Sequence, residues 1–326
     1  MAMKPKVLLT RLLPEGAVIR LSETCDLDVN REDRALTRDE LLAGVRGMDA
    51  LLCLLTDTVD GPVMDAAGSG LKVIANYAVG FNNVDVGAAT ARRIPVTNTP
   101  DVLTDATADL AWTLIMSTMR RVTEGDRTMR AGQFGGWAPL FMLGAEVTGA
   151  TLGLYGLGRI GRAVARRAAG FRMRILYHDP APIGPDTERE LGAKRADFEA
   201  LLAESDVISI HVPLTDTTRH RFTLAEFARM KRTAHLVNTS RGGIVKEEDL
   251  AAALQQGLIA GAGLDVYENE PRMAPGLANL GNVVLAPHLG SATFPTRTNM
   301  ARIAVDNVLA AVEGRRPPNC VNPEVL

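Results

Sequence analysis

Residues 151–167 read TLGLYGLGRIGRAVARR and contain the pattern G-x-G-x-x-G, with glycines at Gly156, Gly158 and Gly161. An apolar run precedes the glycines and a pattern of helical spacing follows them, which predicts a strand, a tight turn and a helix. In such a unit the first glycine permits the turn and the second lets backbone approach a pyrophosphate at the helix N-terminus. The third allows close packing of helix and strand. The stretch therefore predicts a dinucleotide-binding unit.

An acidic residue stands where the next strand of this unit should end. The run RILYHD at 174–179 ends in Asp179, 18 residues after the third glycine, where a carboxylate can accept hydrogen bonds from an adenosine ribose. The same carboxylate would repel the 2′-phosphate of NADP, and the next basic residue is Arg189. We therefore predict NAD as the cofactor, with Arg159 and Ile160 as further contacts in the turn. A tight turn without a ligand is the alternative.

The alternation of apolar runs and helical patterns extends over almost the whole chain. Apolar runs that predict strands lie at 6–13, 49–55, 71–78, 94–100, 174–179, 206–212, 234–240, 261–267 and 282–288. Helical patterns lie at 37–47, 83–92 and 299–314, and a longer one begins near Asp105. Strands separated by helices form parallel sheets with helices on both faces, so the predicted fold class is α/β. Glycines and a proline in 132–144 predict a loop.

Composition limits the size, partners and compartment of the protein. The chain has 326 residues, 46% of them hydrophobic. This length is greater than one hydrophobic core usually serves, so it predicts about two domains. A net charge of −2 offers no basic surface for nucleic acid, and three scattered cysteines argue against a disulfide framework or a metal site. The sequence has no signal-peptide pattern and no apolar stretch of transmembrane length. We therefore expect a soluble cytoplasmic protein with no membrane partner.

Three chemically suitable side chains stand just beyond the last three strand runs. They are Arg241, Glu270 and His288. In a parallel α/β sheet such strand ends share one edge, where ligands bind. Arginine can bind a carboxylate and polarise a carbonyl, and a histidine supported by a carboxylate can donate a proton near neutral pH. The three residues therefore predict hydride transfer to a 2-keto acid. Of the five histidines, His211 is the rival to His288 because it also lies near a strand end.

Six stretches give the chain a resemblance to a known family. They lie at 76–85, 99–112, 156–167, 238–245, 263–271 and 287–293. Through them the chain resembles the D-2-hydroxyacid dehydrogenases, and most of all the glyoxylate/hydroxypyruvate reductases. The resemblance implies two doubly wound parallel-sheet domains, with a Rossmann NAD-binding domain inserted into a flavodoxin-like substrate-binding domain. It implies a substrate domain made of 1–100 and 290–326, and an NAD domain made of 101–289.

The resemblance also implies roles for individual residues. Arg241, Glu270 and His288 would be catalytic, with His288 as the proton donor. Backbone amides at Val79 and Gly80 would bind the substrate carboxylate, together with Arg241. Further cofactor contacts are implied for Pro213, Thr239, Ser240, Asp265, His288 and Gly290.

A homodimer is the assembly that the resemblance implies. The long helix after Asp105 would lie in the interface, and Trp137 of one subunit would reach the substrate pocket of the other. A buried tryptophan in a linker is the alternative for Trp137. Some family members have Gly-Arg in place of Asp179-Pro180 and prefer NADP, so the acid in this chain argues for NAD.

The function predicted first is NADH-dependent reduction of glyoxylate, hydroxypyruvate or a similar small 2-keto acid. A second hypothesis is another D-2-hydroxyacid dehydrogenase or a phosphite dehydrogenase. Phosphoglycerate dehydrogenases often carry a regulatory domain, and too few residues follow His288 to form one, which argues against that class. Formate dehydrogenases have glutamine where Glu270 stands, which argues against that class as well. A third hypothesis is a non-catalytic binding protein that senses NAD(H), like the transcriptional corepressors of this fold.

Overall fold

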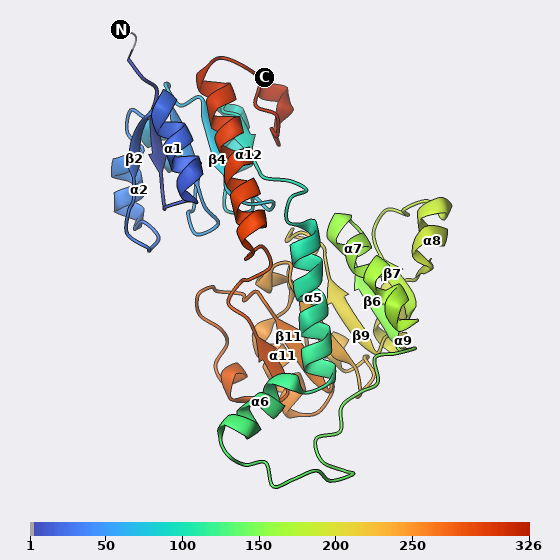
Figure 1. Cartoon of the computed structure of the whole chain (residues 1–326). Helices are drawn as coiled ribbons and strands as arrows, with labels where there is room; N and C mark the ends of the chain where they lie inside the picture. Colours follow the sequence, from blue (N-terminus) through green and yellow to red (C-terminus); the bar gives the residue numbers. More distant parts are fainter. Residues whose placement is uncertain (1–2) are drawn as a thin grey trace. The chain divides into compact units, whose positions relative to one another are not determined.

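The computed structural model describes residues 3–326, which form two compact units. Unit 1 combines the described part of Met1–Leu103 with Thr293–Leu326, and unit 2 is Thr104–Ala292. Each unit contains one sheet in which every neighbouring pair of strands is parallel (Figure 1). The predicted α/β class with two parallel-sheet domains is confirmed.

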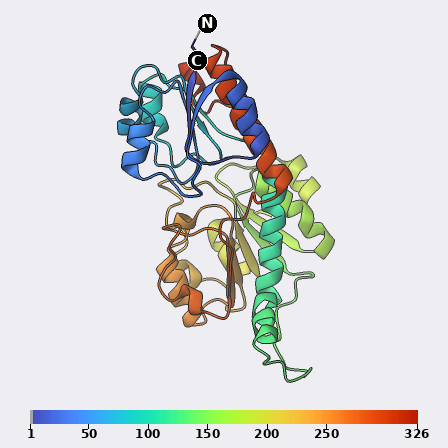
Figure 2. The same ribbon diagram turned by 60° about the vertical axis from the view of Figure 1, so that its left-hand side comes forward.

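Unit 1 has the strand order β2-β1-β3-β4-β5, which is the order of flavodoxin-like sheets. Its elements are β1 Lys6–Leu9, α1 Glu15–Thr24, β2 Asp26–Val29, α2 Arg38–Gly44, β3 Ala50–Cys53, α3 Gly61–Ala67, β4 Val73–Asn76, α4 Val86–Ala91, β5 Val96–Thr97 and α12 Phe294–Val312. Helices α1 and α12 come from opposite ends of the chain and pack together beside this sheet (Figures 1 and 2). Their apolar residues share one core with β1, β3 and β4.

Unit 2 has the strand order β12-β11-β10-β9-β6-β7-β8, which extends the Rossmann order by one strand. Its strands are β6 Thr151–Tyr155, β7 Arg174–His178, β8 Ala193–Arg195, β9 Val207–Ile210, β10 His235–Asn238, β11 Gly261–Leu264 and β12 Val283–Leu285. Its helices are α5 Thr104–Met119, α6 Val122–Arg130, α7 Arg159–Ala168, α8 Pro185–Leu191, α9 Phe198–Glu204, α10 Leu224–Phe227 and α11 Glu247–Gln255. The order reverses between β6 and β9, and ligands of open α/β sheets bind at such a point.

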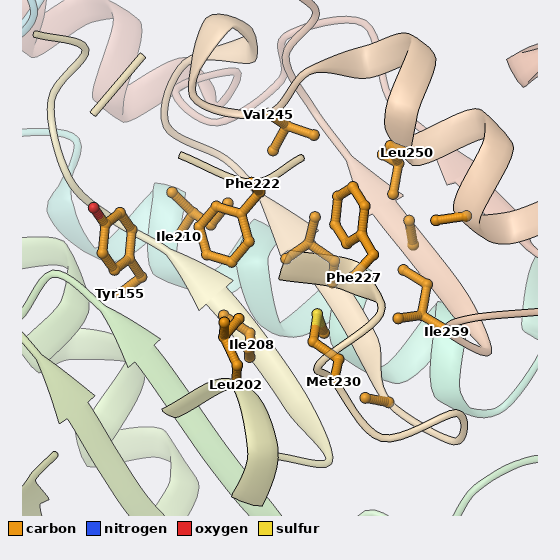
Figure 3. Packing of buried hydrophobic residues seen from close by; sticks show 14 of the residues in the cluster. Tyr155, Leu202, Ile208, Ile210, Phe222, Phe227, Met230, Val245, Leu250 and Ile259 are labelled. Carbon is orange, nitrogen blue, oxygen red and sulfur yellow. The ribbon is translucent and has the colours of Figure 1, made fainter. Parts of the chain in front are cut away.

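Two apolar layers hold the sheet of unit 2. Residues of α5 and α7 form one core with the central strands. On the other face, Phe222 and Phe227 are fully buried among aliphatic side chains that include Ile208 (Figure 3). Burying one such phenylalanine contributes about 1.5–3 kcal/mol, so this core fixes the loops that follow β9 and β10.

The segment 132–144, predicted as a loop, contains no helix or strand, and Figures 1 and 2 draw it as a long connection between α6 and β6. Helices α1, α3, α6 and α8 to α11 and strands β2 and β8 were not predicted, and the predicted strands extend beyond the observed ones. The run at 6–13, for example, corresponds to β1 Lys6–Leu9, because its last apolar residues leave the sheet edge as a loop.

Within residues 3–326, no helix is both long and apolar enough to span a bilayer.

Candidate active site

The glycine turn lies where the strand order of unit 2 reverses. Gly156 follows β6 with a φ of +98°, and a Cβ on it would lie 2.8 Å from the carbonyl carbon of His211. A Cβ on Gly161 would lie 2.4 Å from the carbonyl oxygen of Gly156. Both positions therefore require glycine. Gly158 is the N-cap of α7 and faces open space, so an approaching phosphate would meet only backbone there.

Asp179 directly follows β7 and is tied to the glycine turn. Its Oδ2 accepts a hydrogen bond of 2.9 Å from the amide of Leu157, and its Oδ1 accepts one of 3.2 Å from Ala181. The guanidinium of Arg195 donates to the backbone carbonyls of Asp179 and Pro180, at 3.0 and 3.1 Å. Sequence reasoning missed Arg195, because it lies 16 residues beyond Asp179 on the edge strand β8. A cation therefore lies beside the carboxylate expected at the ribose.

The other expected cofactor residues also lie in unit 2. Arg159 and Ile160 open α7, and Pro213 lies exposed in the loop after β9. Thr239 follows β10, and its Oγ1 is buried without a hydrogen-bond partner among residues 3–326. The hydroxyl of Ser240 donates to the carbonyl of Val212. A buried hydroxyl that lacks a partner and an uncapped helix beside Gly158 both fit a polar, phosphate-bearing ligand.

His288 and Glu270 form a hydrogen-bonded pair. The Nδ1 of His288 lies 2.9 Å from Oε2 of Glu270, and the side chain of His288 is 32% exposed. The other carboxylate oxygen of Glu270 accepts a 3.0 Å hydrogen bond from the amide of Tyr267. Burial alone would raise the pKa of Glu270, but His288, the Tyr267 amide and the charge of Arg241 lower it below its usual value. The bond at Nδ1 orients the imidazole and leaves Nε2 for proton transfer.

The backbone of His288 is held in the left-handed region by Asp265. His288 has a φ of +55°, which is uncommon for a residue other than glycine. Its amide donates to the carbonyl oxygen of Asp265 at 2.9 Å, and the Asp265 carboxylate accepts from Leu289 at 2.6 Å and Gly290 at 2.8 Å. Asp265 is fully buried, and this burial raises its pKa. Asp265 thus shapes the turn that carries His288, a role that sequence reasoning missed.

Arg241 follows β10 and interacts electrostatically with Glu270. Burial lowers the pKa of Arg241 and the charge of Glu270 opposes that shift, although an arginine of this kind remains protonated. Its Nη1 also donates a 2.7 Å hydrogen bond to the carbonyl of Ser240. The structure therefore brings the three predicted catalytic residues to the same edge of the sheet of unit 2.

The other histidines have different surroundings. The Nε2 of His211 lies 2.9 Å from the hydroxyl of Ser209, and burial lowers the pKa of His211 to about 3. His235 begins β10, and burial lowers its pKa to about 4. Both are neutral near pH 7, which removes His211 as a rival proton donor. The Nε2 of His220 lies 2.5 Å from Oε1 of Glu268, and no motif predicted this second histidine–glutamate pair.

Three further predicted residues belong to other segments of the chain. Val79 and Gly80 follow β4 in unit 1, and their carbonyls accept hydrogen bonds from Asn98 at 2.8 Å and Asn76 at 2.9 Å. Neither amide of Val79 or Gly80 has an acceptor among the described residues. Trp137 lies in the 132–144 loop and is 85% exposed, so it is not buried within its own chain.

The position of Gly242 gives a stability prediction. A Cβ on Gly242 would lie only 1.8 Å from the carbonyl carbon of Tyr267, a backbone atom that cannot easily move. We expect Gly242→Ala to lower the free energy of unfolding by at least about 2 kcal/mol through overpacking. Urea denaturation followed by circular dichroism measures this loss. Gly281→Ala is the control, because a Cβ there meets nothing within 4 Å; equal midpoints for the two variants would contradict the packing described.

Comparison with known proteins gives the class of this fold and site. A sequence model of the family described as "D-isomer specific 2-hydroxyacid dehydrogenase, NAD binding domain" matches residues 112–290. The chain belongs to the D-isomer-specific 2-hydroxyacid dehydrogenase family, which confirms the family predicted from its motifs. It is thus an oxidoreductase that uses a nicotinamide dinucleotide.

Several individual proteins of this family are similar to the chain over nearly its whole length. The chain is 49% identical to the glyoxylate reductase of Thermococcus kodakarensis over 328 residues, which cover 99% of this chain and 98% of that protein. Among solved structures, a Thermus thermophilus protein has a TM-score of 0.90 and 47% identity over 97% of this chain and 99% of that one. An NADPH-dependent glyoxylate/hydroxypyruvate reductase from Sinorhizobium meliloti has a TM-score of 0.86 and 34% identity, covering 98% of both chains.

Proposed function

We propose that this protein catalyses the NADH-dependent reduction of a small 2-keto acid, glyoxylate or hydroxypyruvate, to the 2-hydroxy acid. The observation that carries the proposal is the His288–Glu270 pair, coupled to Arg241 at the ligand-binding edge of a dinucleotide-binding sheet. The glyoxylate reductases among its relatives support the choice of substrate.

The roles of the residues follow from the demands of the reaction. The bound cofactor supplies a hydride to the carbonyl carbon of the substrate. Arg241 binds the substrate carboxylate and polarises the carbonyl, so that negative charge on the developing alkoxide is stabilised. His288 holds the proton at Nε2 and delivers it to the alkoxide oxygen, while Glu270 stabilises the imidazolium that carries it. One hydride and one proton convert the keto acid to the hydroxy acid.

We assign the remaining substrate and assembly contacts to Val79, Gly80 and Trp137. Asn98 and Asn76 bind the carbonyls of Val79 and Gly80, which leaves the two amides available for a carboxylate. The exposure of Trp137 supports its assignment to the substrate pocket of a second subunit in a homodimer. Sedimentation of the protein tests the dimer, and a monomer at micromolar concentration would refute it.

Substrate choice is tested by following NADH oxidation with a panel of 2-keto acids. The panel contains glyoxylate, hydroxypyruvate, pyruvate, phenylpyruvate and 3-phosphohydroxypyruvate. We expect fast turnover with the first two. A preference for a bulkier acid would keep the mechanism and refute the substrate, and NADH binding without turnover on any acid would refute the enzyme itself.

The preference for NAD rests on Asp179. A carboxylate at the adenosine ribose repels the 2′-phosphate of NADP, although Arg195 lies close by. Asp179→Asn removes the charge and keeps an oxygen acceptor for the amide of Leu157. We expect the ratio of kcat/KM with NADH to kcat/KM with NADPH to fall about 10- to 100-fold, since like charges in contact cost several kcal/mol.

The control for this prediction is Asp186→Asn, which removes a charge from the exposed first turn of α8 in the same unit. It should leave the cofactor ratio unchanged. A wild-type enzyme that prefers NADPH, or an Asp179→Asn enzyme with the wild-type ratio, would refute the role of Asp179.

A further inference from the structure

The second histidine–glutamate pair lies between the two loops that carry the proposed catalytic residues of unit 2. We define the Arg241 loop as residues 239–246 and the Glu270 loop as residues 265–276. The backbone amide of His220 donates a 2.9 Å hydrogen bond to the carbonyl of Gly243 in the Arg241 loop. Its ring Nε2 lies 2.5 Å from Oε1 of Glu268 in the Glu270 loop. One residue therefore connects both loops.

The backbone of His220 is constrained to make both contacts. Its φ is +49°, in the left-handed region that residues other than glycine seldom adopt. Two residues later, Phe222 is fully buried in the core shown in Figure 3, and its amide donates to the carbonyl of Ile244 in the Arg241 loop. The core thus fixes the position of His220 from one side, and its side chain extends from there to Glu268.

Glu247 begins α11 directly after the Arg241 loop and makes two contacts with the Glu270 loop. Its Oε2 accepts a 2.7 Å hydrogen bond from Ala274, and its amide donates to Oε2 of Glu268 at 3.3 Å. Glu247 is only 5% exposed, and its Oε1 is buried without a hydrogen-bond partner among the described residues. These contacts attach the start of α11 to the Glu270 loop.

Solvent reaches the side chains of the His220–Glu268 pair. His220, Glu247, Glu248 and Glu268 line a surface cavity of about 530 Å³. The side chains of His220 and Glu268 are 38% and 21% exposed, and a hydrogen-bonded pair that solvent reaches adds little to folding stability. The effect of the pair is therefore to connect the Arg241 loop to the Glu270 loop.

We propose that His220, acting through Glu268, is a positioning residue that keeps the Arg241 loop and the Glu270 loop in register. Tyr267 and Glu268 directly precede the segment that presents Glu270 to His288, and the Tyr267 amide binds the Glu270 carboxylate. A shift of the Glu270 loop therefore turns Glu270 away from His288, and displacements of about 1 Å cost reaction rates up to 100-fold. The inference rests on the proposed function of Arg241, Glu270 and His288.

The test compares four variants of the full chain. His220→Ala breaks the pair, and His220→Gln keeps a donor near the position of Nε2. Glu248→Gln is the control, because it removes a charge from the same cavity at an exposed residue. Glu270→Gln is the reference for a lost catalytic contact. The measurements are kcat, KM, the dissociation constant of NADH, and the alkaline pH at which kcat falls by half.

We expect His220→Ala to lower kcat by at least about tenfold, with NADH binding unchanged. The alkaline fall of kcat should move to lower pH, as it does in Glu270→Gln, because a displaced carboxylate no longer stabilises the protonated imidazole. His220→Gln should recover most of both effects, and Glu248→Gln should match the wild type. If His220→Ala does not fold, Glu268→Gln replaces it, with a smaller change in the same direction.

Two outcomes overturn the inference, and they are distinguishable. If Glu270→Gln alters kcat and its pH dependence while His220→Ala, or Glu268→Gln in its place, does not, the positioning role is wrong and the proposed function stands. The positioning role is also wrong if His220→Gln is as impaired as His220→Ala. If Glu270→Gln itself behaves as the wild type, the proposed function fails, and the inference fails with it.

Discussion

His288→Asn is expected to lower kcat about 1,000-fold and leave the dissociation constant of NADH unchanged. Asparagine places its amide nitrogen near Nδ1, so it can still donate to Glu270, but it has no group at the position of Nε2. The substitution therefore removes proton donation while preserving the turn, and general acid catalysis contributes typically 10²–10⁴-fold. Stopped-flow absorbance with saturating NADH and glyoxylate measures the change.

The matched control is His211→Asn, at the histidine that is neutral and bonded to Ser209. It should retain turnover within a few-fold of the wild type. A result in which the His211 variant is inactive and the His288 variant is active would reverse the assignment of the proton donor. Fluorescence titration with NADH shows whether either loss reflects cofactor binding.

Arg241→Ala is expected to reduce kcat/KM by about 10²- to 10⁴-fold, because the substrate loses both a carboxylate ligand and the charge that polarises its carbonyl. Truncating one partner of a buried, hydrogen-bonded charge pair costs about 3–5 kcal/mol. Arg241→Lys should recover little, since an ammonium cannot form the two parallel hydrogen bonds of a guanidinium.

Chemical rescue shows whether Arg241→Ala loses activity because the guanidinium is missing or because the fold is damaged. Added guanidinium chloride at low, non-denaturing concentration should restore part of the activity of Arg241→Ala and none of the activity of His288→Asn. Arg232→Ala is the control, because Arg232 is exposed and precedes β10, at the opposite end of that strand from Arg241. Full activity of Arg241→Ala without rescue would exclude a substrate contact for Arg241.

The fold could be predicted from the sequence wherever burial leaves a periodic signal. Strands β3, β4 and β10 are buried at every residue, so their apolar runs are conspicuous. The edge strands β2 and β8 escaped prediction because solvent reaches them: Asp26–Val29 has no fully buried residue, and Ala193–Arg195 has one. An edge strand is defined by its neighbour's hydrogen bonds, which its own residues do not encode.

The candidate site could be predicted from the sequence only where its residues lie close to the ends of predictable strands. Arg241, Glu270 and His288 lie three to six residues beyond the ends of three adjacent strands, so the parallel topology brings their loops to one edge of the sheet. The His220–Glu268 pair joins residues 48 positions apart, and Arg195 reaches Asp179 from an unpredicted edge strand. Such contacts depend on loop paths and side-chain reach, which have no periodic signature in the sequence.

The division of the chain between the two units has a consequence for its biogenesis. Unit 2 is continuous from Thr104 to Ala292, whereas the core of unit 1 needs Met300, Val305 and Val308 from α12 to cover β3 and β4. Domains fold as units while the ribosome adds about 5–20 residues per second. On a nascent chain the middle unit can therefore fold while the first hundred residues wait, with one apolar sheet face covered only in part by α1, until α12 emerges. During that interval the N-terminal segment depends on chaperones more than the dinucleotide-binding unit does.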